Sequence, residues 1–423
     1  MNVVVVGAGR IGLPIATAIA ARGHRVVACD IDPARVDAIN RGENPISDEA
    51  GLAGLLAEVA GAGALRATTD TESAVRDAAV VLFAVAVDVD AAGRADTSAL
   101  VSATRDVARG VPDGALCIFD TTLPVGSTRN LLAPELLDAV PGATRQIFVA
   151  FSPERLFMGR VLEDITKYPK VVGGLDKESG RRAADFYRAA LGVEVIELAS
   201  AEAAELSKLA EGAYRDLNIA LANELAQVAD VHRIDISEVI AAANSQSYSH
   251  VHTPGTGVGG HCIPVYPQFL MAGEGPSSLS ALGRAVNDAM PAYAVRRLDE
   301  LVGPLSGKTV LVAGLTFRPD VAVVAHTNAV DLREALEAAG TEVQGHDPLL
   351  DTAAIERLGF RRADEPLARF DVAIVHAFHT AYRDVDWASV ASVVLDARNA
   401  MDRSRIESGG SRYLGIGRPL TDA

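Results

Sequence analysis

The sequence predicts an α/β protein with more than one domain, and three observations lead to this prediction. The chain has 423 residues, more than a single hydrophobic core usually supports. Short valine-rich runs alternate with alanine-rich helical patterns, as expected for helices that cover a parallel sheet. This alternation occurs towards both ends of the chain, and a long helical run separates the two regions. We therefore predict two Rossmann-like, doubly wound domains joined by a long central helix and a helical middle domain, with boundaries at 1–199, 200–301 and 302–423.

The first strand and turn carry a dinucleotide-binding pattern. A buried strand at Val3–Val6 leads into Gly7-Ala-Gly9-Arg-Ile-Gly12, a helical pattern follows, and a second strand ends at Asp30. Glycines at this spacing permit a tight turn, let a pyrophosphate approach the amides at the helix N-terminus, and allow close helix packing. A carboxylate about 20 residues later accepts bonds from ribose hydroxyls and repels a 2′-phosphate. NAD is therefore the expected cofactor, and a glycine turn that binds no dinucleotide is the alternative.

The expected cofactor site extends from this turn to the ends of the neighbouring strands. It comprises Gly7, Gly9, Arg10, Ile11, Gly12, Asp30, Ile31, Arg35, Val85 and Thr122.

The same periodicities predict the elements that follow. We expect strands at Val80–Val87, Ala115–Phe119, Ile147–Phe151, Val310–Ala313, Val343–His346, Val372–His376 and Val393–Leu395, helices at Ala201–Ala229 and Leu279–Leu301, and a frayed tail from Ser408 to Ala423.

Three segments carry candidate chemistry. The loop Gly255–Pro267 packs four glycines and two prolines around Cys262, which is a candidate nucleophile or an inert thiol in a tight turn. Thr122 lies in a hydroxyl-rich turn directly after a predicted strand, where ligands of α/β proteins bind, although such turns are also common without function. Glu154 also follows a strand, and it is a candidate general base or one half of a surface ion pair with Arg155.

Charge and cysteine content exclude several classes of protein. The formal net charge is −16 and the isoelectric point is about 5.0, which argues against nucleic-acid or anionic-membrane partners. Three scattered cysteines form neither a disulfide framework nor a CxxC metal motif, so we predict no metal site. There is no signal-peptide pattern at the N-terminus and no apolar run long enough to span a membrane, and a cytoplasmic protein is expected.

Two long motifs resemble the UDP-glucose/GDP-mannose dehydrogenase family. They are Gly257-Val-Gly-Gly-His-Cys262-Ile-Pro and the helical stretch that begins Lys208-Leu-Ala-Glu-Gly-Ala-Tyr-Arg-Asp-Leu-Asn. The likeness covers essentially the whole chain and is greatest to the branch that oxidises UDP-N-acetylmannosamine and related sugars to uronic acids. The resemblance implies a homodimer that acts on a nucleotide sugar with NAD.

The resemblance also implies roles for individual residues. Cys262 would capture an aldehyde and pass through a thioester, Lys208 would stabilise oxyanions, Glu154 would take part in thioester hydrolysis, and Thr122 would position a water. Tyr266 would stand at the position of a catalytic base. The implied substrate contacts are Glu154, Arg155, Leu156, Lys208, Tyr248, Gly259 and Arg318.

The chain departs from the family pattern at several of these places. Tyr266 replaces an aspartate, Gly212 replaces an asparagine that stabilises the oxyanion, and Tyr248 stands where an arginine reaches the neighbouring subunit's ligand. The segments 85–88 and 320–328 also differ from the usual pattern. Loss of one oxyanion donor can cost ~10²–10³ in rate and loss of a base ~10²–10⁴, so these departures bear on the reaction. Tyr266 could carry a proton, or it could pack or stack on a substrate ring.

Three hypotheses follow. The first is full oxidation of a primary alcohol, on an altered sugar nucleotide or nucleoside, in a specialised pathway such as antibiotic biosynthesis. The second is a two-electron or transient oxidation on an altered substrate. The third is a catalytically silent protein that binds NAD or a nucleotide.

Overall fold

A computed structural model describes residues 1–46, 49–90, 94–137, 146–157, 159–271, 278–364, 367 and 369–419. It divides into two compact units. Met1–Glu211 and Gln268–Ala272 form the first, and Gly212–Pro267 and Gly273–Ala423 form the second. The predicted division into three domains stays a prediction.

The first unit is built on an eight-stranded sheet in the order β10-β9-β8-β7-β4-β1-β2-β3. At its centre, β1 pairs in parallel with β2 and β4, so that Val3 lies opposite Val26 on one side and Val80 on the other. The valines of β1 are buried because both faces of the sheet are covered. The order in which strands are added to the sheet reverses between β1 and β4. Ligands of such sheets bind at the carboxyl ends of the strands at this point.

The elements of this unit match the predicted α/β pattern. Its strands are β1 (Asn2–Val6), β2 (Arg25–Cys29), β3 (Leu65–Thr68), β4 (Val80–Phe83), β7 (Leu116–Phe119), β8 (Phe148–Phe151), β9 (Lys170–Gly174) and β10 (Val195–Leu198), with a separate hairpin of β5 (Asp88–Val89) and β6 (Ala95–Asp96). Its helices are α1 (Gly12–Ala21), α2 (Pro33–Asn40), α3 (Leu52–Gly61), α4 (Thr71–Ala74), α5 (Ser98–Gly110), the π-helix η1 (Thr128–Leu132), α6 (Ala133–Leu137), α7 (Val161–Asp164) and α8 (Lys177–Leu191).

Two features of this sheet differ from the predictions. The strand expected at Val80–Val87 ends at Phe83, because the chain turns away there towards the hairpin. Strands β3, β9 and β10 were not predicted, and β9 runs antiparallel to β8. The antiparallel edge extends the sheet on the side away from the first turn.

The second unit contains a parallel six-stranded sheet in the order β13-β12-β11-β14-β15-β16. Its six strands are wound in the same order as β3, β2, β1, β4, β7 and β8 in the first unit. The elements are β11 (Thr309–Ala313), β12 (Glu342–His346), β13 (Arg361–Arg362), β14 (Phe370–Val375), β15 (Ala391–Asp396), β16 (Arg412–Gly415), α10 (Ile236–Ala243), α12 (Leu279–Val302), α13 (Ala329–Ala338), α14 (Thr352–Arg357), η2 (Thr380–Tyr382), α15 (Trp387–Val390) and α16 (Arg403–Ser408). The predicted fold class, two Rossmann-like sheets with helical segments between them, is confirmed.

The frayed tail predicted from Ser408 onward is wrong over its described part. Strand β16 pairs with β15, and two of its own residues, Tyr413 and Leu414, are buried. The glycines at 409 and 410 form the turn into this strand. Residues 420–423 lie outside the described part of the chain.

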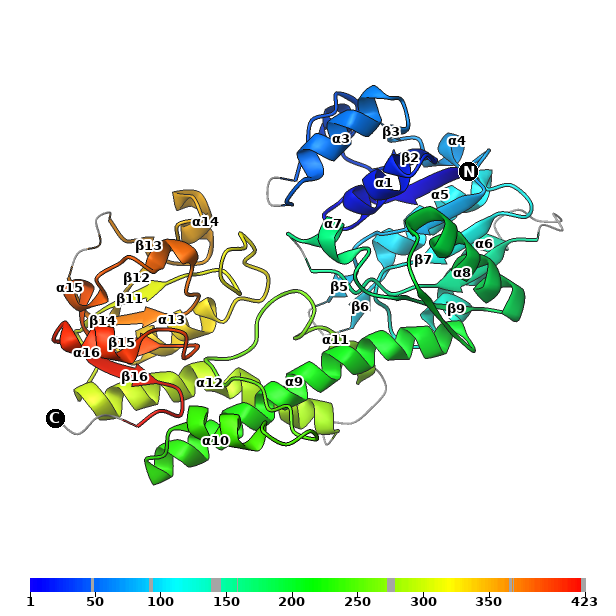
Figure 1. Cartoon of the computed structure of the whole chain (residues 1–423). Coiled ribbons are helices and arrows are strands. Elements are labelled where there is room, and N and C mark those ends of the chain that lie inside the picture. The colour runs from blue at the N-terminus through cyan, green and yellow to red at the C-terminus, as the bar shows by residue number, and fades with distance from the viewer. Residues whose placement is uncertain are drawn as a thin grey trace. The chain divides into compact units, whose positions relative to one another are not determined.

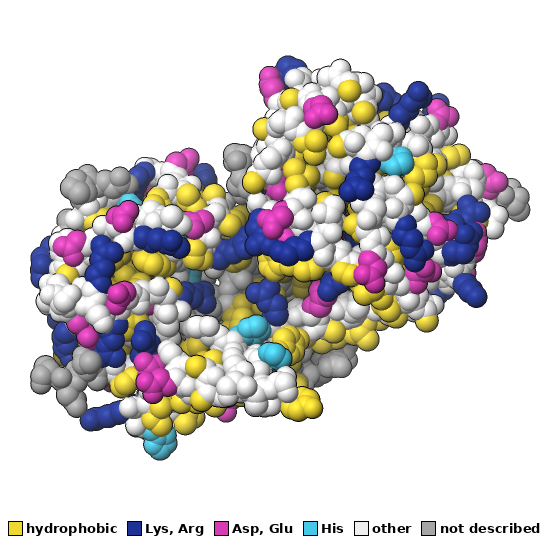
Figure 2. Space-filling model, viewed as in Figure 1, with side chains coloured by type: hydrophobic (Ala, Val, Ile, Leu, Met, Phe, Trp, Pro, Cys, Tyr) yellow, Lys and Arg dark blue, Asp and Glu magenta, His cyan; other side chains and the backbone are white. Residues whose placement is uncertain are grey.

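The predicted long helix is present as α9 (Ala201–His232) and forms one continuous element in Figure 1. Its later part packs against α12 in the second unit, where a side chain at Gly283 would lie 2.7 Å from Leu217. No helix in the described residues is both long and apolar enough to cross a membrane. Acidic and basic side chains are interspersed on the face shown in Figure 2.

A buried polar network closes the carboxyl edge of the second sheet. Asp347, directly after β12, accepts the backbone N–H groups of Leu315 and Thr316 at 2.7 and 3.1 Å. It also lies 3.1 Å from the Nε2 atom of His379, and both side chains are almost fully buried. His376, directly after β14, is buried as well, and burial, followed by the Arg398 charge, lowers its pKa from 6.5 to about 3.

We predict that His376 makes the folded protein less stable in mild acid. Between about pH 6.5 and 3 the unfolded chain binds a proton at this position and the folded chain does not, so stability falls as the pH drops. One pKa unit corresponds to about 1.4 kcal/mol, so the loss from this group between pH 7 and about pH 5 is about 2 kcal/mol. Denaturant unfolding at both pH values measures it.

His376→Gln should reduce this pH dependence, whereas substitution of the exposed His232 by Gln should leave it unchanged. An equally steep loss of stability in wild type and His376→Gln would contradict the assignment.

Candidate active site

The turn after β1 has the backbone that the glycine pattern requires. Gly7 has φ of +95°, a region that favours glycine, and a side-chain carbon there would lie 2.7 Å from the carbonyl oxygen of Ala84. A side-chain carbon at Gly12 would lie 1.9 Å from the carbonyl oxygen of Gly7, so α1 can approach the turn only with glycine at this position. The Cβ position of Gly9 has no heavy atom within 4 Å. The space beside the backbone at the N-terminus of α1 is therefore open, as the binding of a pyrophosphate requires.

Asp30 lies at the end of β2 beside this turn. Its carboxylate accepts the N–H groups of Ala8 and Asp32, both at 3.0 Å, and pairs with the Nη1 atom of Arg35 at 2.9 Å. Ile31, the next residue, is 96% exposed, an unusual position for a large apolar side chain unless something covers it. Asp30 offers a carboxylate to the ribose of an adenosine, and Ile31 offers an exposed apolar surface to its base.

The carboxyl ends of β4 and β7 lie side by side, next to the point between β1 and β4 where the strand order reverses. Thr121 donates a hydrogen bond of 2.6 Å to the carbonyl oxygen of Val85, so the turn that contains Thr122 is fixed to the end of β4. Farther along this turn, the N–H and the hydroxyl of Thr128 donate to buried Glu205 at 2.8 and 2.6 Å. Glu205 therefore fixes the first turns of α9 to the strand ends.

Glu154 follows β8, and the predicted alternative for it, a surface ion pair with Arg155, is wrong. The carboxylate pairs with Lys170 of β9, and both side chains are nearly buried. Arg155 instead pairs with Glu211 of α9 at 2.7 Å, and Glu211 also lies 3.9 Å from the Nζ atom of Lys208. The Lys208 side chain is 13% exposed, so it is not the solvated lysine that an isolated helical position usually indicates.

Sequence reasoning missed three residues around Glu154. Asp120, the first residue after β7, accepts a hydrogen bond of 2.7 Å from the hydroxyl of Tyr187 on α8, and the Lys170 ammonium lies 4.5 Å from the centre of the Tyr187 ring. The position of Asp120 directly after a buried strand was a usable signal. Lys170 gave no signal because its strand β9 was not predicted, and Tyr187 gave none because it lies on α8 outside any recognised motif.

In the second unit, the glycines of the cysteine loop allow close contact with another part of the chain. A side-chain carbon at Gly257 would lie 2.8 Å from the side chain of Asn328, and one at Gly259 would lie 2.6 Å from the carbonyl oxygen of His326. One at Gly260 would meet the ring of Phe317 at 2.8 Å. The loop therefore needs glycine because it packs on residues 317–328.

Hydrogen bonds fix the same loop to the edge of the second sheet. The N–H of Thr256 donates to the carbonyl oxygen of Ala397 at 3.2 Å, and Arg398 donates to the carbonyl oxygen of Gly257 at 2.8 Å. From α9, Asn223 accepts the N–H of Gly255 at 2.9 Å. Cys262, which is partly buried, follows this anchored stretch.

The departures at positions 212 and 266 lie against each other. Cys262 begins the turn that leads into α11 (Tyr266–Leu270), since its carbonyl oxygen accepts the N–H of Tyr266 at 2.9 Å. The Tyr266 side chain lies against α9 at Gly212, where a side-chain carbon would be 2.7 Å from Cδ2 and 2.8 Å from Cβ of the tyrosine. The tyrosine therefore occupies the space that a side chain at position 212 would need.

The remaining predicted contacts lie in different surroundings. Leu156 is partly buried and packs against the core of the first unit. Tyr248 is 93% exposed in the segment after α10. The guanidinium of Arg318 lies 5.6 Å from the centre of the Phe317 ring.

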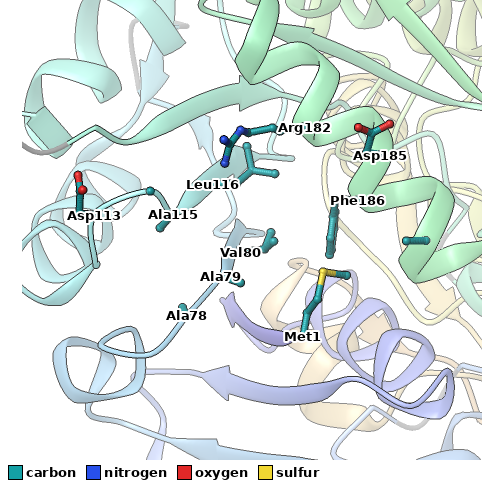
Figure 3. A pocket seen from close by; sticks show the side chains of 12 residues that line it. Met1, Ala78, Ala79, Val80, Asp113, Ala115, Leu116, Arg182, Asp185 and Phe186 are labelled. Atoms are coloured by element: carbon teal, nitrogen blue, oxygen red, sulfur yellow. The ribbon is translucent and has the colours of Figure 1, made fainter.

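Pockets lie in both units among the described residues. One, of about 340 Å³, lies in the second unit and is lined by Val258 and Pro264 of the cysteine loop together with Arg284, His326 and Asn328. The buried Oδ1 atom of Asn328 has no hydrogen-bond donor among the described residues. The other, of about 470 Å³, lies in the first unit at the amino ends of β4 and β7, away from the glycine turn, and is shown in Figure 3.

The chain matches three family descriptions. Residues 1–191 match the NAD binding domain of the UDP-glucose/GDP-mannose dehydrogenase family, 202–287 its central domain and 311–403 its UDP binding domain.

Relatives of similar length extend this match. The chain is 32% identical over 415 residues to the NDP-N-acetyl-D-galactosaminuronic acid dehydrogenase of Ralstonia nicotianae, covering 95% of this chain and 96% of the relative. It is 32% identical over 424 residues to the UDP-N-acetyl-D-mannosamine dehydrogenase of Escherichia coli, covering 93% and 97%. The solved structure of UDP-D-ManNAc dehydrogenase from Pyrococcus horikoshii superposes with a TM-score of 0.87 at 29% identity and covers 99% of each chain.

We predict that positions 212 and 266 are energetically coupled. Gly212→Asn alone should destabilise the fold by about 1–3 kcal/mol because its side chain overlaps Tyr266, and Tyr266→Asp alone should lose the packing of the ring. The double variant should be more stable than the sum of the two effects by at least about 1 kcal/mol, because the smaller aspartate makes room for asparagine. Denaturant unfolding of all four proteins measures the coupling.

A matched comparison uses Gly54, whose Cβ position on α3 has no heavy atom within 4 Å. Gly54→Asn combined with Tyr266→Asp should be additive. Additivity at Gly212 as well would show that the two side chains are independent.

Proposed function

Because the chain belongs to the UDP-glucose/GDP-mannose dehydrogenase family, we propose that it oxidises a primary alcohol of a sugar nucleotide, or of a nucleoside, to the carboxylate. The resemblance inferred from the sequence is confirmed, and the chain is an NAD-dependent oxidoreductase acting on CH–OH groups. The observation that carries the finer proposal is the cysteine loop, in which a partly buried thiol follows an anchored glycine stretch.

The proposed reaction removes four electrons in two steps. The alcohol carbon loses a hydride to NAD and its hydroxyl loses a proton, which gives an aldehyde. The Cys262 thiolate adds to the aldehyde carbon and the oxygen takes up a proton, which gives a thiohemiacetal. Its carbon then loses a hydride to a second NAD and its hydroxyl loses a proton, which gives a thioester. Water then replaces the sulfur, which releases the carboxylate and restores the thiol. Covalent capture prevents loss of the aldehyde between the two oxidations.

The first unit supports the roles proposed for its polar residues. Lys208 is shielded from solvent and shares Glu211 with Arg155, so a cation is available to a developing oxyanion. Glu154 is a nearly buried carboxylate, suited to hydrolysis of the thioester, and Thr122 lies in the fixed turn and would position the water.

We also propose which residues hold the ligands. Open backbone at Gly9 and the exposed Ile31 support a cofactor site made of Gly7, Gly9, Arg10, Ile11, Gly12, Asp30, Ile31, Arg35, Val85 and Thr122. For the substrate we propose Glu154, Arg155, Leu156, Lys208, Tyr248, Gly259 and Arg318. The substitutions at 212, 248 and 266 are our reason for proposing a specialised biosynthetic pathway, such as that of an antibiotic.

A second candidate is a reaction that stops after two electrons. It is favoured by positions 266 and 212, where the family pattern has a base and an oxyanion donor. In this chain Tyr266 fills the space beside Gly212. In this case the product is an aldehyde or ketone, or the oxidation is reversed to give a net rearrangement.

We further propose a homodimer formed through α9. Tyr214, Leu221 and Val228 are spaced by seven residues, which places them on one side of the helix, and each is about half exposed. Val231 near the end of the helix is 79% exposed. Large apolar side chains in such a row favour burial against a second copy of the chain.

The test of the reaction is a count of NADH formed per molecule of product, across a panel of sugar nucleotides and nucleosides, with products identified by mass spectrometry. We expect two NADH and a carboxylate. One NADH with an aldehyde or ketone, or none with a rearranged sugar, would support the second candidate.

Substitution of the nucleophile tests covalent capture. Cys262→Ser and Cys262→Ala should each lower turnover to acid by at least about 10³-fold, because the thioester cannot form. Cys117→Ser, at a buried cysteine in β7, is the matched control and should retain turnover if it folds. Normal acid formation by Cys262→Ala would exclude the thioester.

Light scattering of the eluting protein tests the dimer. The wild-type chain should have twice the mass of one chain, and Leu221→Glu combined with Val228→Glu should shift it to one chain, because two charges would be buried at the interface. The exposed Glu224→Gln on the same helix should remain dimeric. A monomeric wild type, or a dimeric double variant, would contradict this interface.

A further inference from the structure

A buried cluster of charged and polar groups surrounds Glu154 in the first unit. Asp120 follows β7, Glu154 and Ser152 follow β8, Lys170 lies on β9 and Tyr187 on α8. Asp120 is 2% exposed, Ser152 and Tyr187 are fully buried, and Lys170 is 6% exposed. Two carboxyl groups and one ammonium therefore share a site from which water is nearly excluded.

Some hydrogen bonds in the cluster are fixed by the identity of the donors. Lys170 can only donate, and it contacts the Oε1 atom of Glu154. The hydroxyl of Tyr187 donates to the Oδ1 atom of Asp120 at 2.7 Å. Of the two carboxyl groups, Glu154 is therefore the one in direct contact with the ammonium.

Two buried carboxyl oxygens of the cluster remain without a donor. They are Oδ2 of Asp120 and Oε2 of Glu154, and neither has a hydrogen-bond donor among the described residues. The two carboxyl groups nevertheless lie close enough to be joined by a hydrogen bond, which requires a proton on one of them. One proton on Asp120 Oδ2, donated to Glu154 Oε2, satisfies both oxygens and leaves the two carboxyls and Lys170 with no net charge.

We propose that Asp120 is a positioning residue that carries a proton at neutral pH and uses it to hold Glu154. The resulting chain of bonds runs from Tyr187 through Asp120 to Glu154, and Lys170 holds the other oxygen of Glu154. The role of Glu154 in the reaction rests on the proposed function, whereas the proton on Asp120 does not.

The surroundings of Asp120 agree with this assignment. The titratable and charged groups facing it are Glu154, Lys170 and Tyr187. Burial, opposed by the Lys170 charge and assisted by Glu154, raises the pKa of Asp120 from 3.8 to about 8. Burial lowers the pKa of Lys170, but Glu154 and Asp120 outweigh that effect and raise it, so the ammonium stays charged.

The direct test is infrared difference spectroscopy of the whole protein without substrate, well below and well above pH 8. A band from a protonated carboxyl should be present at the lower pH and should disappear with an apparent pKa near 8. Labelling aspartate with carbon-13 should shift the band, and Asp120→Asn should remove it. No such band, or a band that persists in Asp120→Asn, would overturn the proposal.

Activity on an accepted substrate then tests the positioning role. In wild type, kcat/KM should fall about tenfold per pH unit above pH 8 as Asp120 loses its proton. Asp120→Asn donates the same bond from its amide, so it should keep at least about a third of neutral kcat/KM and lose this alkaline decline, whereas Asp120→Ala should lose at least about tenfold at neutral pH. Equal neutral activities in Asn and Ala variants would contradict the role.

Tyr187→Phe is the matched control. It removes the donor to Oδ1 but not the bond to Glu154, so the infrared band should remain and titrate at a higher pH, since the tyrosine bond lowers the Asp120 pKa. Absence of activity on every substrate, with the band behaving as expected, would count against the proposed function and leave the proton on Asp120 established. Activity in a protein that lacks the band would support the proposed function and overturn the proton on Asp120.

Discussion

The position of Cys262 in the second unit depends on glycines, which have no side chain. Gly257, Gly259 and Gly260 lie so close to residues 317–328 that a single added carbon would overlap another part of the chain. Close packing lets backbone groups of the loop bond to the edge of the sheet: the N–H of Thr256 donates to the carbonyl oxygen of Ala397, and the carbonyl oxygen of Gly257 accepts from the side chain of Arg398. A loop fixed through its backbone leaves less conformational freedom at the sulfur, as the proposed role of Cys262 requires. The glycines that suggest a ligand-binding loop in the sequence therefore serve the internal packing of the protein.

How much the sequence could predict depended on how local each signal was. The valine runs, the glycine turn after β1 and the length of α9 are encoded within a few turns or strands, and these predictions agree with the structure. The antiparallel β9 and the edge strand β16 depend on pairing between distant segments, which a local pattern does not specify. The ion pair between Lys170 and Glu154 was missed for the same reason, because its partners belong to neighbouring strands of the sheet.

The contact between Gly212 and Tyr266 changes how the departures from the family pattern should be interpreted. In the sequence they are two separate losses, of an oxyanion donor and of a base. In the structure the tyrosine ring occupies the space next to the glycine, so the two positions form one packed unit. A change at either position alone would leave an overlap or a gap, and the pair is therefore best regarded as one alteration of the site.

Each of the two sheets has an aspartate directly after one of its strands, but the surroundings of the two aspartates differ. Asp30 and Asp347 each follow the second strand in their winding order and accept N–H groups from the turn after the first. Asp30 pairs with a partly exposed arginine that can move, whereas Asp347 is held by a buried histidine and has no exposed oxygen to offer a ribose. In the proposed four-electron reaction both NAD molecules must then use the turn at Gly7–Gly12 one after the other. The enzyme would have to exchange NADH for NAD while the substrate stays attached to Cys262, so the lifetime of that covalent bond would set how slowly the cofactor may leave.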